Sequence, residues 1–309
     1  MNAKSPVPEH RGALLENLYR RYNRREAARN DPVRFLYRYG DARDREIAGL
    51  IASALALGNV KQIIASVGAV LECMGPSPSD YLDGASRSAL LKEFARFSHR
   101  FITGEELASM LFGVKRMIQT YGSIKAGISA GLKPDDATIL PALSAFVEEL
   151  RAAWRGRENR LVPDPAKGSA CKRLNLFLRW MVRRDAVDPG GWDNIPAAKL
   201  IMPLDTHTDR ICRALGLTRH RQPTMRTALE ITAAFRRIVP DDPVRYDFAL
   251  AHLGIDGGEN LAMFLKQWSE FRVVATIRTE GNSNGTHGIP NREEHHDSFR
   301  RRIAGEKSL

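Results

Sequence analysis

Two side chains in the stretch from Lys167 to Leu215 could do nucleophilic and acid–base chemistry together. Lys172 follows the run Lys-Gly-Ser-Ala-Cys and opens an amphipathic helix, because apolar residues recur after it at helical spacing. Asp205 stands in a Leu-Asp-Thr-His run, immediately before the next apolar helix. We expect Lys172 and Asp205 to face each other across one cleft, although they are far apart in the chain.

Lys172 falls in the first turn of its helix, where the macrodipole is positive and opposes a positive side-chain charge. Partial burial of the amine would disfavour the ammonium form further. A neutral lysine amine is a nucleophile that forms Schiff bases with carbonyl carbons. The alternative interpretation is a solvated surface lysine near a helix end, which is what most lysines are.

Asp205 also admits two interpretations. An aspartate just before an apolar-periodic segment is usually an N-cap, which accepts a hydrogen bond from the start of the helix. Placed opposite a lysine, the same carboxylate could accept a proton or stabilise a developing positive charge. The pair, rather than either residue alone, favours the catalytic interpretation.

The two motifs together resemble the helix-hairpin-helix DNA glycosylases of the endonuclease III superfamily. There a Gly-x-Gly-x-Lys turn carries a nucleophilic lysine, and a later Val-Asp-Thr-His run carries the essential aspartate. On this chain the first glycine is Gly168, the lysine is Lys172 and the aspartate is Asp205. Two positions differ, because Ala170 replaces the second glycine and Arg173 stands where threonine is common. The long interval between lysine and aspartate is more similar to the archaeal 8-oxoguanine glycosylases.

A longer stretch resembles a family of uncharacterised bacterial proteins that is grouped with these glycosylases. The run Gly-Ser-Ala-Cys-Lys-Arg-Leu-Asn carries this resemblance, together with Phe-Leu-Arg-Trp-Met-Val-Arg after it. It covers most of residues 11–256 and implies membership of a family without an established activity.

The resemblance to the glycosylases implies an enzyme that removes a damaged base, with an oxidised purine such as 8-oxoguanine as the expected target. Lys172 would attack the anomeric carbon of an everted nucleotide, and Asp205 would stabilise the positive charge on the sugar. The resulting Schiff base would permit β-elimination and strand cleavage, and these steps require neither a metal nor an organic cofactor. The alternative is a protein of the same fold that recognises DNA structure without cutting it.

A metal-dependent hydrolase is a third interpretation, because Asp205, His207 and Asp209 are acceptable metal-ligand types. Residues at i, i+2 and i+4 do not all share one face of a helix, however. No second cluster of histidine and acidic residues stands out in the sequence to complete such a site.

The resemblance also indicates which residues would contact DNA phosphates. Those near the lysine and the aspartate are Lys167, Gly168, Ser169, Arg173, His207 and Arg210, with Lys199 and Arg213 as further candidates. Those in a loop between two earlier helices are Asn59, Lys61 and Gln62, which could hold a phosphate or fill the space of an extruded base. An ordinary helix–helix corner is the plainer interpretation of that loop. Trp180, Trp192 and Phe248 could stack on the base, although core packing is the more usual role of such residues.

Composition and charge limit these interpretations. The chain has 309 residues, of which 43% are hydrophobic and 27% are charged, as in ordinary soluble globular proteins. Its formal net charge is +11, and nearly all of the excess lies before Gly257, which suits a polyanion such as double-stranded DNA. No apolar run is long enough for a membrane span, and no signal peptide is expected.

The cysteines are Cys73, Cys171 and Cys212, which are far apart and form no metal-ligand pattern. They indicate reduced thiols in a cytosol. Three are too few for the four-cysteine iron–sulfur cluster of many endonuclease III relatives. We therefore expect a cytoplasmic, nucleoid-associated monomer that binds double-stranded DNA carrying a damaged base.

Helical periodicity without convincing strand alternation predicts an all-α fold, a two-lobed helical bundle of the glycosylase type. Residues 1–10 are expected to be a flexible N-terminus. Residues 11–256 form the body, with the cleft near the lysine–aspartate pair. Residues 257–309 form a tail, with one possible helix at 260–272 followed by disorder.

Within the body, apolar spacing and breaks predict the helices that position the pair. They cover 11–29, a segment started by Asp31 and Pro32, 41–57, and Val60 to Gly75. Three more lie within 79–156, two of them around Leu107 and Leu140, and the last ones surround Leu174, Ile211, Ile231 and Leu250. Asp241 and Asp242 are expected to cap the helix that ends at Gly254. Residues 157–168 would have to supply the hairpin and look irregular. His99 is interpreted as structural, because nothing else converges on it in sequence.

Overall fold

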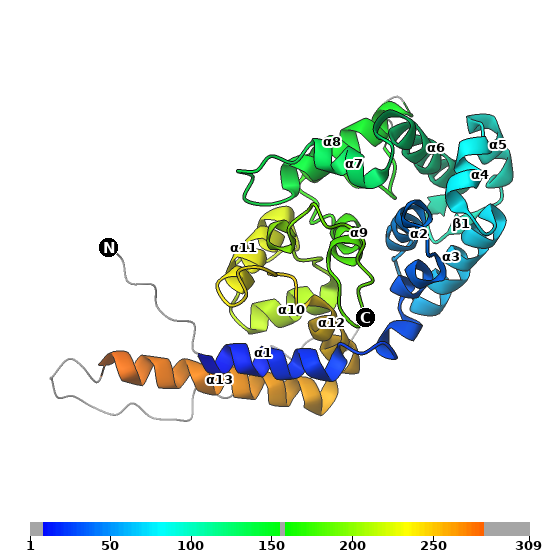
Figure 1. Ribbon diagram of the computed structural model, residues 1–309. Coiled ribbons are helices and arrows are strands. Elements are labelled where there is room, and N and C mark those ends of the chain that lie inside the picture. The colour runs from blue at the N-terminus through cyan, green and yellow to red at the C-terminus, as the bar shows by residue number, and fades with distance from the viewer. Residues whose placement is uncertain (1–8, 155–157, 281–309) are drawn as a thin grey trace. The chain divides into compact units, whose positions relative to one another are not determined.

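The chain folds into helices joined by short loops, as seen in a computed structural model that describes residues 9–154 and 158–280 (Figure 1). The one sheet within those residues is an antiparallel pair, β1 (Ser98–His99) and β2 (Ile102–Thr103). The all-α prediction is therefore confirmed apart from this short hairpin. Across the described segments, no helix combines the length and the apolar character that crossing a bilayer requires.

The N-terminal segment is α1 (Glu9–Tyr22), followed by two 3-10 helices, η1 (Ala27–Asn30) and η2 (Pro32–Arg38). The helix predicted over 11–29 is thus too long, because the residues between Tyr22 and Ala27 are all polar and provide no apolar face. The predicted start at Asp31 is confirmed, since its side chain accepts a hydrogen bond of 2.8 Å from the Val33 N–H.

Capping residues set the starts of the next two helices. Asp41 caps α2 (Ala42–Ala54), and the Asn59 side chain accepts from the Lys61 N–H to cap α3 (Val60–Met74). Gly75 ends α3 with a positive φ of 76°, a conformation that costs glycine little.

The middle of the chain forms α4 (Pro78–Gly84), α5 (Arg87–Glu93), the β-hairpin, α6 (Gly104–Tyr121), α7 (Ile124–Ala130) and α8 (Leu140–Ala152). The helices predicted around Leu107 and Leu140 are confirmed. The hairpin escaped prediction because strands of two residues are too short to show alternation. His99 is buried in it and braces the α2–α3 loop, since its ring nitrogens lie 3.1 Å from the Leu57 carbonyl oxygen and 2.9 Å from the Ser66 hydroxyl.

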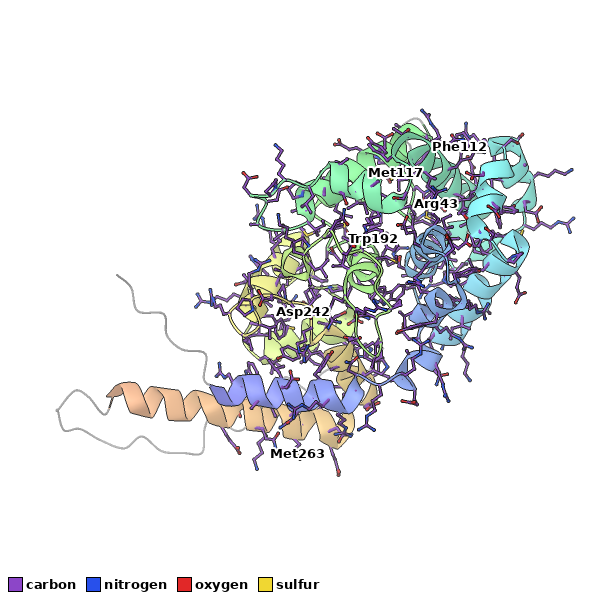
Figure 2. The ribbon with its side chains drawn as sticks, viewed as in Figure 1. Arg43, Phe112, Met117, Trp192, Asp242 and Met263 are labelled. Atoms are coloured by element: carbon purple, nitrogen blue, oxygen red, sulfur yellow. The ribbon has the colours of Figure 1, made fainter. Side chains whose placement is uncertain are left out.

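The rest of the body forms η3 (Pro165–Lys167), α9 (Lys172–Val182), η4 (Ala197–Lys199), α10 (Thr206–Ala214), α11 (Met225–Arg236), α12 (Asp247–Asp256) and α13 (Gly258–Glu280). The predicted cap of α12 is wrong. Asp242, labelled in Figure 2, accepts hydrogen bonds from Arg183, and α12 begins at Asp247 without a side-chain cap. Its end at Asp256 lies beyond the predicted Gly254.

The compact unit that contains these helices runs through Ser269, and a second unit covers residues 270–309. The first half of α13 belongs to the body, because Phe264, Leu265 and Trp268 are buried. The indole N–H of Trp268 donates to the Leu215 carbonyl oxygen at 3.0 Å. The body therefore extends past the predicted boundary at residue 256. The predicted flexible N-terminus and disordered tail lie mostly outside the described residues.

The three aromatic residues considered for base stacking are buried in the core. Trp180, Trp192 and Phe248 are 0%, 3% and 6% exposed, so they pack the interior rather than face a ligand. Trp192, labelled in Figure 2, donates its indole N–H to the buried Glu46 carboxylate at 2.9 Å. Burial raises the pKa of Glu46. The same carboxylate accepts the Ile124 N–H, so it ties α2 to α7.

Candidate active site

A tight turn delivers the chain to the start of α9. Gly168 has a positive φ of 79°, and its carbonyl oxygen accepts the Met225 N–H at 3.1 Å. Ser169 forms an isolated β-bridge with Thr224. The turn is thereby fixed against the start of α11, and Lys172 lies in the first turn of α9, as predicted.

The residue before Lys172 has an unusual backbone. Cys171 has a φ of 47°, in the left-handed region, which costs a non-glycine residue about 1–2 kcal/mol. The Cys171 side chain is 1% exposed, and burial raises the pKa of its thiol to about 11. This thiol is therefore protonated at neutral pH and unreactive as a nucleophile.

Asp205 begins α10 and uses its two carboxylate oxygens differently. Oδ1 accepts the Thr208 N–H at 2.7 Å, so Asp205 is the N-cap of α10. Oδ2 lies 3.8 Å from Nζ of Lys172. The two interpretations of Asp205 are therefore geometrically compatible, because capping holds one oxygen while the other points to the lysine.

The Lys172–Asp205 pair is loose and accessible. Its separation of 3.8 Å is longer than a hydrogen bond, and the two side chains are 34% and 21% exposed. Each side chain stands at the start of a helix, where backbone N–H groups are unpaired and attract anions. An incoming anionic ligand could thus reach both side chains.

Behind this pair lies a buried ionic network that the sequence analysis missed. Arg179, two turns along α9 from Lys172, donates to Asp247 at 2.5 Å and to Asp188 at 3.1 Å. Arg183 contacts Asp188 as well, and also binds Asp185 and Asp242. The signal in the sequence was Arg179 on the helix that Lys172 opens and Arg183 just after that helix, followed by the aspartates Asp185 and Asp188.

Asp247 links this network electrostatically to the site. Burial raises its pKa to about 6, although Arg179 beside it acts in the opposite direction. The charge of Asp205 raises the pKa of Asp247, and the charge of Lys172 lowers it. A change of charge in the Lys172–Asp205 pair would therefore change the pKa of Asp247.

Comparison with protein families matches residues 31–256 to the model of a family of proteins of unknown function, DUF2400. The chain belongs to the DUF2400 family. No curated protein and no solved structure matches it. The matched region contains Lys172, Asp205 and the whole ionic network behind them.

Arg173 of this DUF2400 protein uses its donors within the fold. Its guanidinium donates to the carbonyl oxygen of Ala54 at 2.6 Å and to that of Arg160. Burial lowers its pKa. The predicted phosphate contact is therefore replaced by a structural one, which joins the end of α2 to the start of α9.

Three other predicted phosphate contacts have partners within the protein. Lys199 donates to the carbonyl oxygens of Lys133 and Pro134 at 2.8 and 2.9 Å, and Arg213 donates to Asp209 at 2.7 Å. These geometries occupy both side chains internally. Lys167 pairs with Glu158 on the surface, and an exposed pair of this kind contributes little and exchanges readily with another anion.

The remaining predicted residues near the pair are accessible to different degrees. Gly168, Ser169 and Arg210 are exposed, and Arg210 has no ionic partner within the described segments. His207 is half-buried against α12, where a Cβ on Gly254 would lie 2.6 Å from the histidine Cβ. Its Nδ1 is buried and makes no hydrogen bond to any described residue.

The α2–α3 loop presents the other predicted contacts. Asn59, Lys61 and Gln62 are exposed, and Asn59 serves as the cap of α3. The loop follows directly on Ala54, whose carbonyl oxygen is held by Arg173 next to Lys172. This connection keeps the loop on the side of the molecule where α9 begins.

The arrangement around Asp205 does not resemble a metal site. Asp209 is paired with Arg213, and Asp205 is shared between the helix cap and Lys172. In the segments 9–154 and 158–280, no three histidine, cysteine or acidic side chains gather closely enough to hold a metal ion.

Proposed function

We propose that this DUF2400 protein is a DNA glycosylase with β-elimination lyase activity, in which Lys172 is the nucleophile and Asp205 assists it. The observation that supports this best is the 3.8 Å separation of Lys172 Nζ and Asp205 Oδ2. Two residues singled out by their motifs, and distant in the chain, meet at the starts of two helices with both side chains accessible.

In the proposed reaction, the neutral Lys172 amine attacks the anomeric carbon of an everted nucleotide. The glycosidic bond breaks, and the base leaves with its electron pair. Asp205 Oδ2 stabilises the positive charge on the sugar and accepts the proton that the amine loses. The Thr208 N–H holds Oδ1, so the carboxylate keeps its orientation during this transfer.

The sugar ring then opens to a Schiff base on Lys172. Removal of a proton from the neighbouring C2′ carbon expels the 3′ phosphate and cuts the strand. Water hydrolyses the Schiff base and restores the lysine. An oxidised purine is the proposed base, on the strength of the resemblance to the archaeal 8-oxoguanine glycosylases.

The charge distribution supports a nucleic-acid partner. The formal net charge is +11, and Arg210, Lys61 and Lys167 are exposed near the two helix starts and the α2–α3 loop. Such side chains bind phosphates without reading sequence. This suits an enzyme that must find a rare lesion in any sequence context.

A second candidate function is binding of DNA structure without cleavage. The observation that favours it is the role of Asp205 as the N-cap of α10, since a capping role alone would explain this aspartate. The replacement of the second hairpin glycine by Ala170, with strain at Cys171, also favours a changed role.

Borohydride trapping on duplexes with a single 8-oxoguanine or abasic site separates the two candidates. The wild-type protein should form a covalent adduct, Lys172→Ala should form none, and Lys167→Ala should still form it, because that substitution removes one surface charge and leaves the proposed nucleophile in place. An adduct that persists in Lys172→Ala but vanishes in Lys167→Ala would show that the nucleophile is misassigned. Tight binding of the duplex without any wild-type adduct would favour the non-catalytic function.

A further inference from the structure

A small cavity of about 100 Å³ lies between the two 3-10 helices of the N-terminal segment. It is lined by Arg25, Ala28, Arg29, Arg34 and Tyr37, and we call it the arginine pocket. Three of its five lining residues are arginines, and none is acidic. The sequence analysis did not single out these residues.

The walls of the arginine pocket are held in place from both sides. The Tyr37 hydroxyl donates to the Val187 carbonyl oxygen at 2.6 Å, which fixes η2 to the loop after α9. The Arg25 guanidinium lies over the Tyr37 ring, a cation–π contact that orients its donors. Asp31 caps η2, so the backbone between the lining residues is also fixed.

The positive charge of the pocket is not balanced from within. Among the described residues, Arg25, Arg29 and Arg34 form no ion pair. The nearest acids in the chain are Asp31, whose carboxylate accepts the Val33 N–H, and Glu26, which does not line the cavity. All three arginines are exposed, so solvent and salt weaken the repulsion among them, and their donors stay accessible to an anion that binds between them.

We propose that the arginine pocket binds a phosphate group of the DNA backbone, at a site separate from Lys172 and Asp205. Guanidinium groups form paired hydrogen bonds to phosphate oxygens, and several arginines around a small concave site suit one tetrahedral anion. The identity of the polymer rests on the proposed function, whereas the preference for phosphate rests on the pocket.

The test measures binding of a fluorescent duplex that carries an uncleavable abasic analogue, by anisotropy at several salt concentrations. The pocket variant is Arg25→Ala/Arg29→Ala/Arg34→Ala. A charge-matched control removes three exposed arginines elsewhere, on and after α5 and on α6, as Arg87→Ala/Arg96→Ala/Arg116→Ala.

The pocket variant should bind about tenfold more weakly. Its plot of log K against log salt should flatten by about 0.9, which is the slope that neutralising a single phosphate contributes. The control should keep the affinity and slope of the wild type. Arg29→Ala/Arg34→Ala, which leaves Arg25 on Tyr37, should show most of the weakening and tests the pocket without disturbing that contact. Equal weakening in pocket and control variants, or none in the pocket variants, would overturn the proposal.

A second arm distinguishes the source of the phosphate. Duplexes with and without 5′ phosphates should bind alike, since the proposed ligand is an internal phosphodiester. A pocket-dependent gain that appears only with 5′ phosphates would assign the pocket to a strand end instead. The borohydride assay stays independent, because a wild-type protein without an adduct but with a pocket-dependent affinity disproves the lyase activity alone.

Discussion

Two ion pairs involve residues on the same face of α9, and they differ in separation and in exposure to solvent. Residues seven apart lie within about 20° of each other around an α-helix, so Lys172 and Arg179 point to the same side. The Lys172–Asp205 pair is 3.8 Å long and partly exposed, whereas the Arg179–Asp247 pair is 2.5 Å long and its side chains are 3% and 4% exposed.

The difference indicates that the two ion pairs on this helix have different roles. A buried, multiply bonded arginine holds the segments that carry Asp188 and Asp247 in fixed places, because breaking either contact leaves a charge in the interior. A loose, accessible pair contributes little to stability and is free to exchange its partner for another ion. The inner pair therefore fixes the helices that carry the outer pair.

Removing the inner cation should have the largest effect on stability. Arg179→Ala leaves the buried carboxylates of Asp188 and Asp247 without this partner, and the free energy of unfolding should fall by about 3–5 kcal/mol. Lys172→Ala should lower it by less than about 1 kcal/mol. Urea unfolding followed by circular dichroism measures both changes. Similar decreases in the two variants would contradict the claim that the inner pair stabilises the fold far more than the outer pair does.

Two substitutions of the outer acid should separate its capping role from its proposed chemical role. Asparagine caps helices as well as aspartate, so Asp205→Asn should keep the stability of the wild type, whereas Asp205→Ala should lose about 1 kcal/mol. Both should lower the rate of adduct formation by about 100–1,000-fold, since the charge that stabilises the sugar cation is gone. A full rate in Asp205→Asn would show that the carboxylate is only a cap.

The inner acid should make stability depend on pH. The pKa of Asp247 is about 6 in the fold against an ordinary value of 3.8, so the folded protein holds this proton more tightly than the unfolded chain. The contribution of Asp247 to stability is therefore largest below about pH 4 and falls as the pH rises through 6. As the pH rises from about 4 to 6, the free energy of unfolding should fall less for Asp247→Asn than for the wild type. Urea titrations of both proteins at matched pH values measure this difference. An identical pH profile would contradict the raised pKa.

A change of packing, with no change of charge, should also test the contact between the helices that carry the two acids. A Cβ at position 254 on α12 would lie 2.6 Å from the His207 Cβ on α10, so Gly254→Ala should cost about 1–3 kcal/mol and displace the start of α10. Gly68→Ala on α3 is the control, because its Cβ meets only Phe35 at 3.9 Å and alanine favours helix by up to about 1 kcal/mol. The midpoint temperature of thermal unfolding should fall for Gly254→Ala and rise for Gly68→Ala.

Much of the fold could be predicted because it is encoded locally. Apolar spacing predicted α3, α6, α8, α9 and α11, and short polar side chains at helix starts predicted the caps Asp31 of η2 and Asp205 of α10. The proximity of Lys172 and Asp205 was expected from two motifs seen together and is observed, whereas their chemical roles stay predictions.

The parts that escaped prediction depend on partners distant in the chain. Nothing near Arg179 in sequence indicates that it meets Asp247, and nothing near Arg173 indicates that its donors face backbone carbonyl oxygens. Asp242 was expected to cap a helix because that role is local, but it accepts hydrogen bonds from Arg183 instead. Periodicity reports which face of a helix is buried, and it does not identify the residue on the other side.

The contacts of Arg173 restrict how this protein can move. One guanidinium joins the end of α2, the chain at Arg160 and the first turn of α9, so these three segments shift together or not at all. Any opening motion near Lys172 must therefore move these segments as a single block. In a deuterium-labelling time course, the amides on either side of this crosslink would share one opening rate.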